Sequence, residues 1–253
     1  MLGNKITELN PVPELTILQT QLGEWDNLNH VIICNSTNEA ILIDPFSGEF
    51  WSNVLMDRNL NKIIIILTHS HWDHTRGVEK FLESNPNTEI YIHELEYKRG
   101  WSGPDTHRWN HQPYSFIDLN YGNLNFEIHC TPGHTPGHIT LIGHGIIISG
   151  DCLFLGRCGR TDLFGGDKYS MWKSLMYLNK KLKKLPKDWL VFPGHKYPLD
   201  DNTNPDYLNL EHVFENNLAI KKQSYDDFCK LDYLEFDDAL AKKSRILKEE
   251  NRL

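Results

Sequence analysis

Four side chains that commonly bind metal ions lie within the segment Thr68-His-Ser-His-Trp-Asp-His74. Alternate side chains of an extended backbone point to the same side, so His69 and His71 can bind one ion together. Asp73 and His74 lie on the following turn, where they can face a second ion. A histidine-rich surface loop is the alternative, but it would need four coincidences directly after one apolar strand. The segment therefore predicts a site for one or two metal ions.

Three later segments can complete such a site, and each follows a stretch with the pattern of a strand. In Thr131-Pro-Gly-His-Thr-Pro-Gly-His138 the glycines and prolines form tight turns that can fix His134 against an ion. Asp151 and His195 each stand at the end of a short apolar run. We expect His138 to be structural, because it begins the next strand. Four loops of this kind, each after an apolar strand, indicate one edge of a sheet sandwich.

The elements that must position these loops can be traced in the pattern of apolar residues. The β-branched run from Lys62 to Leu67 predicts a strand buried on both faces. Further strands are expected at residues 14–20, 30–34, 40–43, 89–93, 126–130, 138–142, 145–148 and 190–192, and helices at 77–83 and 169–182. Residues 47–60 form a mixed segment that starts with a breaker. The simplest interpretation is one catalytic domain over residues 1–200, with a helical extension over 201–253 packed on it.

Residues 99–123 differ from the rest, because they combine glycine, proline, asparagine and histidine with several aromatic side chains. Long irregular segments inside a domain often form lids or binding loops. The alternative is a packed surface loop whose aromatic side chains fill a side core. The sequence leaves both possibilities open.

Composition and charge narrow the class of protein. With 253 residues and 40% apolar content, the chain can bury a sizeable core. Its net charge of −8 argues against nucleic acid as the main partner. The first ten residues lack an apolar export signal, and no apolar run approaches the length of a membrane span. Five cysteines without a C-x-x-C pair favour a reduced protein, so we expect a cytoplasmic location and no membrane partner.

The strings THSHWDH, TPGHTPGH, SGDCLF and FPGHKY resemble, in order, the motifs of the metallo-β-lactamase-fold superfamily. The resemblance covers roughly residues 14–200 and implies an α/β fold, a four-layer αβ/βα sandwich of two mixed sheets flanked by helices. It also implies two divalent metal ions, zinc or a zinc–iron mixture. The implied ligands are His69, His71 and His134 for the first ion, Asp73, His74 and His195 for the second, and Asp151 as a bridge.

The same resemblance implies a hydrolase. A metal-bound water, as a hydroxide shared by the two ions, would be the nucleophile, with Asp73 beside it as the catalytic carboxylate. The ions would also polarise the substrate carbonyl and stabilise its oxyanion. Cys152 and Cys158 lie beside the site, but we expect Cys152 to pack inward as a small hydrophobic residue and assign Cys158 no role.

Within the superfamily, Gly150-Asp-Cys-Leu-Phe154 followed by Cys158-Gly-Arg-Thr-Asp-Leu163 looks most like the glyoxalase II and persulfide dioxygenase branch. Members of that branch act on glutathione-linked small molecules. The resemblance implies that Arg160 lies near the glutathione, and a guanidinium can bind a carboxylate through two hydrogen bonds. The alternative for Arg160 is an internal salt bridge. Tyr197 aligns with a tyrosine that would line the pocket.

Our first expectation is therefore a thioester or related ester hydrolase that resembles hydroxyacylglutathione hydrolases. The runner-up is a persulfide dioxygenase with one iron(II) held by His69, His134 and Asp151, which form a two-histidine, one-carboxylate set. A lactonase, or a catalytically silent binding protein on the same fold, is the remaining alternative. The ligand residues alone do not choose among these.

Overall fold

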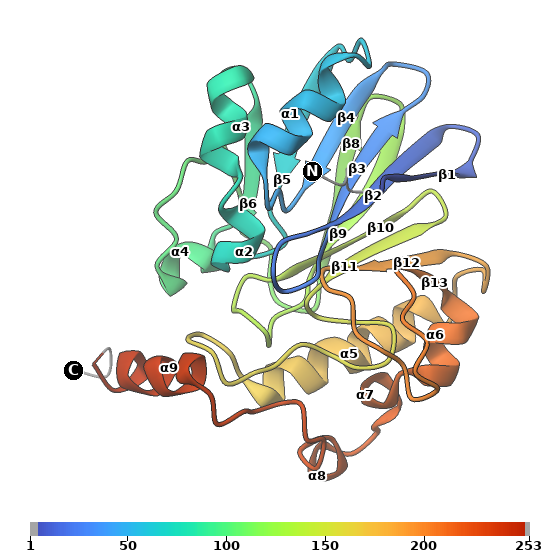
Figure 1. The fold of residues 1–253 in the computed structure, drawn as a ribbon. Helices are drawn as coiled ribbons and strands as arrows, with labels where there is room; N and C mark the ends of the chain where they lie inside the picture. Colours follow the sequence, from blue (N-terminus) through green and yellow to red (C-terminus); the bar gives the residue numbers. More distant parts are fainter. Residues whose placement is uncertain (1–4, 251–253) are drawn as a thin grey trace.

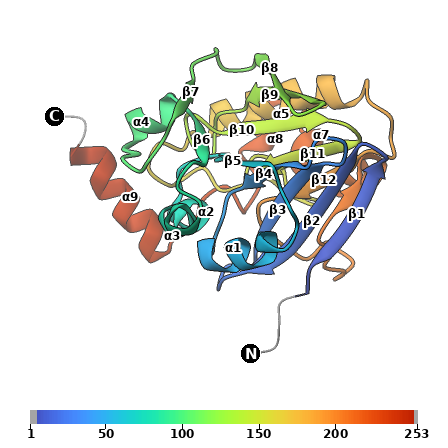
Figure 2. The same ribbon diagram turned by 90° about the horizontal axis from the view of Figure 1, so that it is seen from above.

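A computed structural model describes residues 5–250 as two β-sheets packed face to face with helices on both outer sides (Figure 1). Seen from above, α1 and α3 lie on one side of the paired sheets and α5 on the other (Figure 2). The four layers of the expected sandwich are thus present. Among the described helices, none is both long enough and apolar enough to cross a membrane.

The first sheet contains the strands of the first half of the chain. Their order is β1-β2-β3-β4-β5-β6-β7, antiparallel from β1 to β4 and parallel from β4 to β7. Parallel neighbours need a crossover, which the helices between these strands supply. The elements are β1 (Thr7–Val12), β2 (Leu15–Leu22), β3 (Asn27–Cys34), β4 (Glu39–Ile43), α1 (Gly48–Met56), β5 (Lys62–Ile66), α2 (Trp72–Thr75), α3 (Val78–Ser84), β6 (Glu89–His93), α4 (Leu95–Arg99) and β7 (His107–Trp109).

The second sheet has the order β13-β12-β11-β10-β9-β8. Its β11–β12 pair is parallel, and α5 makes the crossover between these two strands. The elements are β8 (Phe116–Tyr121), β9 (Leu124–Cys130), β10 (Ile139–Gly143), β11 (Ile146–Gly150), α5 (Lys168–Leu182), β12 (Leu190–Pro193), β13 (Leu208–Asn209), α6 (Leu210–Asn216), α7 (Leu218–Lys221), α8 (Tyr225–Phe228) and α9 (Ala239–Glu250).

Three apolar layers hold the sandwich together, one between the sheets and one beneath each set of helices. Strand β5 contributes to two of them, because Ile64 and Ile66 face the other sheet while Ile65 faces α1 and α3. The prediction of a strand buried on both faces is therefore confirmed. The loop that follows β5 therefore begins at the end of a strand that is packed on both faces.

The predicted elements of the first half of the chain did not include strands β1 and β7 or helices α1, α2 and α4. Helix α1 occupies much of the segment expected to be mixed, and its N-terminal residue Ser47 accepts a hydrogen bond from the Phe50 N–H at 3.3 Å. Gly48, taken for a breaker, permits close packing: a Cβ there would lie 2.1 Å from the Gly77 carbonyl oxygen. Glycine is needed at position 48 because α1 packs closely against the start of α3. It does not interrupt the helix.

Residues 99–123 are a packed segment and not a lid. They contain β7 and β8, and both Trp109 and Tyr121 are only 8% exposed in the layer between the sheets. Trp101 packs beneath the helices of the first sheet. None of these residues lines the large cavity described below. Of the two possibilities that the sequence leaves open, these contacts favour the packed segment whose aromatic side chains fill a core.

Residues that follow β12 pack on the outer face of the second sheet. Leu210, Val213, Ile220 and Phe228 lie in the same apolar layer as Leu175 and Leu178 of α5. Helix α9 lies at the end of the described chain, at the left in both views. Phe236, in the segment that joins α8 to α9, and Leu240, in α9, both line the cavity described below.

Candidate metal centre

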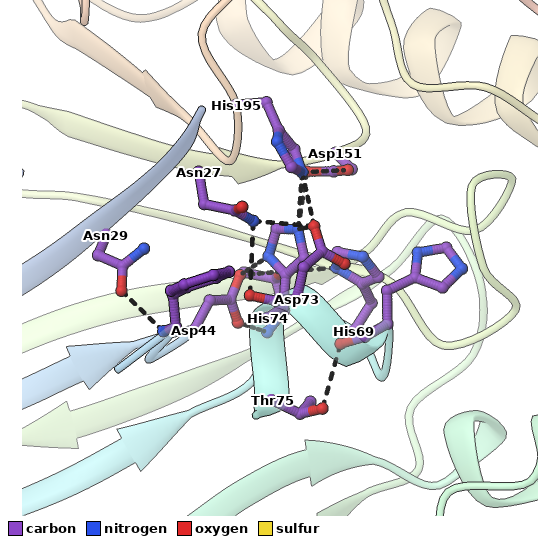
Figure 3. Close-up of polar contacts among 12 residues, drawn as sticks. Asn27, Asn29, Asp44, His69, Asp73, His74, Thr75, Asp151 and His195 are labelled. Atoms are coloured by element: carbon purple, nitrogen blue, oxygen red, sulfur yellow. Dashed lines mark hydrogen bonds and ion pairs between the residues drawn. The ribbon is translucent and has the colours of Figure 1, made fainter. Parts of the chain in front are cut away.

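The predicted ligand residues meet at one end of the sandwich, in loops that follow β5, β9, β11 and β12. Strand ends of layered α/β proteins are rigid platforms from which loops present functional groups. Figure 3 shows Asp73, His74, Asp151 and His195 converging, with the first two carried by α2 (Figure 3). Residues that are more than 120 positions apart in sequence, such as His74 and His195, become direct neighbours.

Two groups of three side chains have donor atoms within 4.8 Å of one another: His69, His71 and His134, and then Asp73, His74 and His195. Asp151 lies between the groups. Its Oδ2 is 3.3 Å from His134 Nε2 and 3.4 Å from His195 Nε2, while its Oδ1 is 3.5 Å from His74 Nε2. The carboxylate of Asp151 can thus reach an ion in either group.

A third combination, Asp44 with His69 and His74, also has donor atoms this close. Both oxygens of Asp44 are already used, however. They accept hydrogen bonds from Thr68 N–H at 2.7 Å and Thr68 Oγ1 at 2.5 Å, and one of them faces His74 Nδ1 at 3.0 Å. Asp44 therefore orients His74 and the strand end rather than serving as a free ligand.

Hydrogen bonds on the far side of the rings set which nitrogen faces the centre. His134 Nδ1 lies 2.7 Å from the Arg160 carbonyl oxygen, and His195 Nδ1 lies 2.7 Å from the Trp25 carbonyl oxygen. A carbonyl oxygen only accepts hydrogen bonds, so each Nδ1 carries the proton and donates it. The Nε2 lone pair of both rings is left for a metal ion, which is the usual arrangement of histidine ligands.

The donor set fits a metal ion. The Nε2 atoms of His69, His71 and His134 and the Oδ1 atom of Asp151 are all buried without a hydrogen-bond partner. Buried polar atoms nearly always have hydrogen-bond partners. Four buried atoms without partners around one point therefore indicate that they bind a common metal ion. Imidazole nitrogens and carboxylates suit zinc or iron.

The charges divide the centre into two halves. Burial lowers the pKa of His69, His71 and His134, and neighbouring histidines add to the effect for His69 and His71, so these rings are neutral. Burial also opposes charge on His74, but the Asp151 and Asp73 carboxylates outweigh it and raise the pKa of His74 to about 9. The half that contains both carboxylates thus favours positive charge, as a cation site should.

Several residues of the centre were missed by the sequence analysis. Asn27 Nδ2 donates a hydrogen bond to Asp73 Oδ2 at 2.8 Å, and Asp44 and Glu96 hold the loops that carry the ligands. His138, expected to be structural, is fully buried, and its Nε2 accepts a hydrogen bond from the Asp151 N–H at 3.0 Å. Asp44 could have been noticed as a polar residue at the end of a predicted strand, whereas nothing local marks Asn27.

A cavity of about 670 Å³ opens beside the metal centre. Its wall includes candidate ligands from both groups, together with aromatic side chains of the first sheet's loops and of the chain after β12. The lining residues are Trp25, Asp26, His71, Trp72, Asp73, His134, Asp151, Phe154, Arg157, Gly159, Arg160, Leu163, His195, Lys196, Tyr197, Pro198, Asn204, Phe236, Asp238 and Leu240. A cavity of this size can hold a small-molecule substrate.

Both residues predicted to bind substrate line this cavity, but they differ in availability. Tyr197 is 37% exposed. Arg160 forms an internal salt bridge, which was the alternative to substrate binding. It lies 2.7 Å from Asp162 and 2.7 Å from Asp238 of the C-terminal extension. Asp238 lies 78 residues from Arg160 in the sequence, so no local pattern indicates this partner.

The cysteines near the centre are not available as nucleophiles. Cys152 and Cys158 are fully buried in the apolar layer beneath α5, and all five cysteines are free thiols. Burial raises the pKa of the Cys152 thiol to about 12 and that of Cys158 further, so neither forms a thiolate near neutral pH. The expectation that Cys152 packs as a small hydrophobic residue is met.

Comparison with known proteins agrees with this architecture. The sequence profile described as "Metallo-beta-lactamase superfamily" matches residues 23–195, and the chain belongs to that superfamily. Among solved structures, the chain is similar to BLEG-1 B3 metallo-beta-lactamase, with a TM-score of 0.66 and 25% identity over 81% of this chain and all of that one. TTHA1623, solved in a di-iron-bound form, has a TM-score of 0.61 and 25% identity over 79% of this chain and 98% of that one.

Curated relatives carry the name hydroxyacylglutathione hydrolase. The protein of Tolumonas auensis is 36% identical over 72% of this chain, and that of Pseudoalteromonas translucida is 33% identical over 68%. The matches cover 66% and 62% of those two relatives, so the chain spans less than two thirds of their length. The protein of Shewanella halifaxensis is 30% identical over 85% of this chain and 86% of its own length.

Proposed function

We propose that the chain is a metal-dependent hydrolase that cleaves thioesters of glutathione or related esters. The observation that carries the hydrolytic part is the position of Asp151 between two sets of three ligand-type side chains. The choice of a thioester is supported by the names of the curated relatives, which are 30–36% identical to this chain.

We assign His69, His71 and His134 to one ion, Asp73, His74 and His195 to a second, and Asp151 to both. Zinc or a zinc–iron mixture suits these nitrogen and oxygen donors. The di-iron form of TTHA1623 supports two ions, since that protein has the same fold. When bound, such ions acidify a coordinated water and polarise the substrate carbonyl.

The chain's own residues prepare the site for this reaction. Asn27 fixes the Asp73 carboxylate by a hydrogen bond of 2.8 Å, and Asp73 faces the cavity. Burial raises the pKa of Asp73, but the charges of His74 and His195 outweigh it and hold the pKa well below its usual range. Asp73 therefore stays ionised and able to bind the second ion. Phe154 and Leu163 add apolar surface to the cavity wall.

Elemental analysis of the purified protein, combined with a thioester hydrolysis assay, tests this proposal. We expect two metal ions per chain, hydrolysis of an S-acyl glutathione, and loss of activity with loss of metal in His69→Ala, His134→Ala and Asp151→Ala. His195→Ala should retain one ion. His212→Ala is a matched control, because His212 is exposed on α6 and distant from the centre.

The alternatives give different results in the same experiment. One iron per chain, unchanged in His195→Ala, with oxygen uptake on glutathione persulfide would establish the dioxygenase. Turnover of a lactone without turnover of a thioester would establish the lactonase, and a protein without stoichiometric metal would be a binding protein. Full turnover by the alanine variants with normal metal content would contradict the ligand assignment.

We also propose that the enzyme acts in the cytoplasm on a small molecule, without nucleic acid or membrane as a partner. The five free thiols and the net charge of −8 support this proposal. We further propose that residues 1–200 form the catalytic unit and residues 201–253 an extension packed on it. The packing of Leu210, Val213 and Phe228 against the second sheet supports the extension's attachment.

A further inference from the structure

Arg160 is not free to bind a substrate carboxylate. Its Nε and Nη2 donate to the two oxygens of Asp162 at 2.7 and 2.8 Å, and its Nη1 and Nη2 donate to Asp238 at 2.7 and 3.1 Å. Asp162 in turn accepts the Phe236 N–H at 2.8 Å. Two carboxylates surround one guanidinium, so this cluster carries a net negative charge and repels an approaching anion. The cluster attaches the C-terminal extension, at Phe236 and Asp238, to the wall of the cavity.

Arg157 lines the same cavity but is bonded very differently. Its guanidinium carbon lies 4.8 Å from the centre of the Tyr197 ring and 4.3 Å from that of Tyr233. It forms no ion pair with any residue in the described range 5–250, and its Nε is buried without a hydrogen-bond partner. Its Nη2 makes a long hydrogen bond of 3.3 Å to the Tyr233 carbonyl oxygen.

A guanidinium stacked between aromatic rings is held in a fixed plane, and its edge still carries several N–H donors. Such an edge matches a carboxylate, which accepts two parallel hydrogen bonds. The side chain is therefore oriented in advance, while its charge is not neutralised by an acidic neighbour. These are the properties expected of an anion-binding arginine.

The other cations of the cavity wall are already paired. Lys196 Nζ lies 2.6 Å from Asp206 Oδ1, and Arg160 is bound by its two aspartates. Setting aside the histidines of the metal centre, Arg157 is the cation of this wall, within the described chain, that lacks a carboxylate partner. Tyr197, which packs against Arg157, also lies near the metal centre, because its ring centre is 6.3 Å from that of His195.

We propose that Arg157, rather than Arg160, binds a carboxylate on the thiol half of the thioester and so determines substrate specificity. This inference rests on the proposed function for the nature of the substrate. Arg160 then positions the C-terminal extension, and Arg157 binds the substrate carboxylate.

Binding of S-methylglutathione, measured by calorimetry on the metal-loaded enzyme, tests the assignment without any turnover. We expect the parent to bind this acid about 10- to 100-fold more tightly than its dimethyl ester, the range of a charge-assisted hydrogen bond. Arg157→Gln should bind the acid as weakly as the parent binds the ester. Arg157→Lys, which keeps the charge, should recover part of the affinity. Arg58→Gln is the control, because Arg58 pairs with Glu8 on the surface.

Several outcomes would overturn the proposal: equal binding of acid and ester by the parent, no binding of either, or unchanged affinity in Arg157→Gln. Equal weakening of acid and ester in Arg157→Gln would show that Arg157 merely supports Tyr197 and Tyr233. If Arg157→Gln unfolds, Arg157→Lys and the ester comparison still decide the question. A parent that binds the acid selectively but hydrolyses no thioester would refute the proposed function and leave the role of Arg157 standing.

Discussion

Glu96 accepts a hydrogen bond from the backbone N–H of Ser70, with 2.8 Å between Oε2 and the nitrogen, inside the segment that carries His69 and His71. Its other oxygen accepts the Gly137 N–H at 2.7 Å. The fully buried Glu96 side chain thus joins two ligand loops that are far apart in sequence. The positions of His71 and His134 depend on one carboxylate that touches neither ring.

Replacing Glu96 by glutamine should weaken both the fold and the metal centre. An amide offers one acceptor oxygen, so one of the two backbone N–H groups would face a donor. Leaving such a buried group unpaired costs about 1–3 kcal/mol. We expect the free energy of unfolding, measured in denaturant, to fall by this amount and metal retention during dialysis to decrease. Glu94→Gln, a change at an exposed neighbour, should match the parent. Equal stability of both variants would refute the connecting role.

The hydrogen bond from Asn27 to Asp73 predicts a selective effect on one ion. In Asn27→Ala the Asp73 carboxylate loses the donor that orients it, while His69, His71 and His134 keep their surroundings. Loss of a partner behind a metal ligand typically lowers metal affinity about 10- to 100-fold. Metal titration should therefore show one weakened and one unchanged site. Asn125→Ala, at an exposed side chain of β9, should change neither. Two sites weakened alike would contradict the separate roles of the two groups.

The two aspartates that bind Arg160 should contribute unequally to stability. The Asp162 side chain is 8% exposed and the Asp238 side chain 43% exposed. Asp162→Asn leaves a largely buried guanidinium short of a partner and weakens the bond to Phe236, so we expect a loss of about 2–3 kcal/mol. Asp238→Asn breaks a solvated pair, which is worth about 1 kcal/mol or less. Thermal and denaturant unfolding of both variants measure the difference, and the reverse order would show that the tail is fastened mainly through Asp238.

His129 should make the fold sensitive to acid. Burial lowers its pKa to about 4, in spite of the neighbouring Glu127. The unfolded histidine has a pKa of about 6.5, so below that pH the unfolded state binds a proton that the folded state does not. The stabilisation is complete above about pH 6.5 and is lost progressively as the pH falls toward about 4, by roughly 2–3 kcal/mol.

The pH dependence can be isolated by comparing the parent with His129→Gln. Glutamine does not titrate, so its free energy of unfolding should fall less between pH 7 and pH 4.5 than that of the parent. His107→Gln, at a side chain that is 47% exposed, should follow the parent. Parallel curves for all three proteins would show that other groups cause the acid sensitivity.

Features that depend only on neighbouring residues can be recognised in the amino-acid sequence of this protein. The β-branched run before Thr68 could only be a buried strand, and the spacing of His69, His71, Asp73 and His74 depends on adjacent residues alone. Turn residues around His134 and strand ends before Asp151 and His195 are equally local features. Such local patterns mark candidate metal ligands because spacing and periodicity act over a few positions. The four-layer fold was implied by the resemblance of four motifs to the superfamily.

Features that depend on residues far apart in the sequence emerge only when the chain is folded. Whether Arg160 meets a substrate or Asp238 depends on where the tail runs, and no local pattern encodes that path. The aromatic residues of 99–123 fill a core because β8 pairs with β9, which the irregular composition concealed. Asn27 and Glu96 reach the metal centre through contacts across 46 and 26–41 residues. Contacts of this range are fixed by packing and burial, so they become visible only in the folded chain.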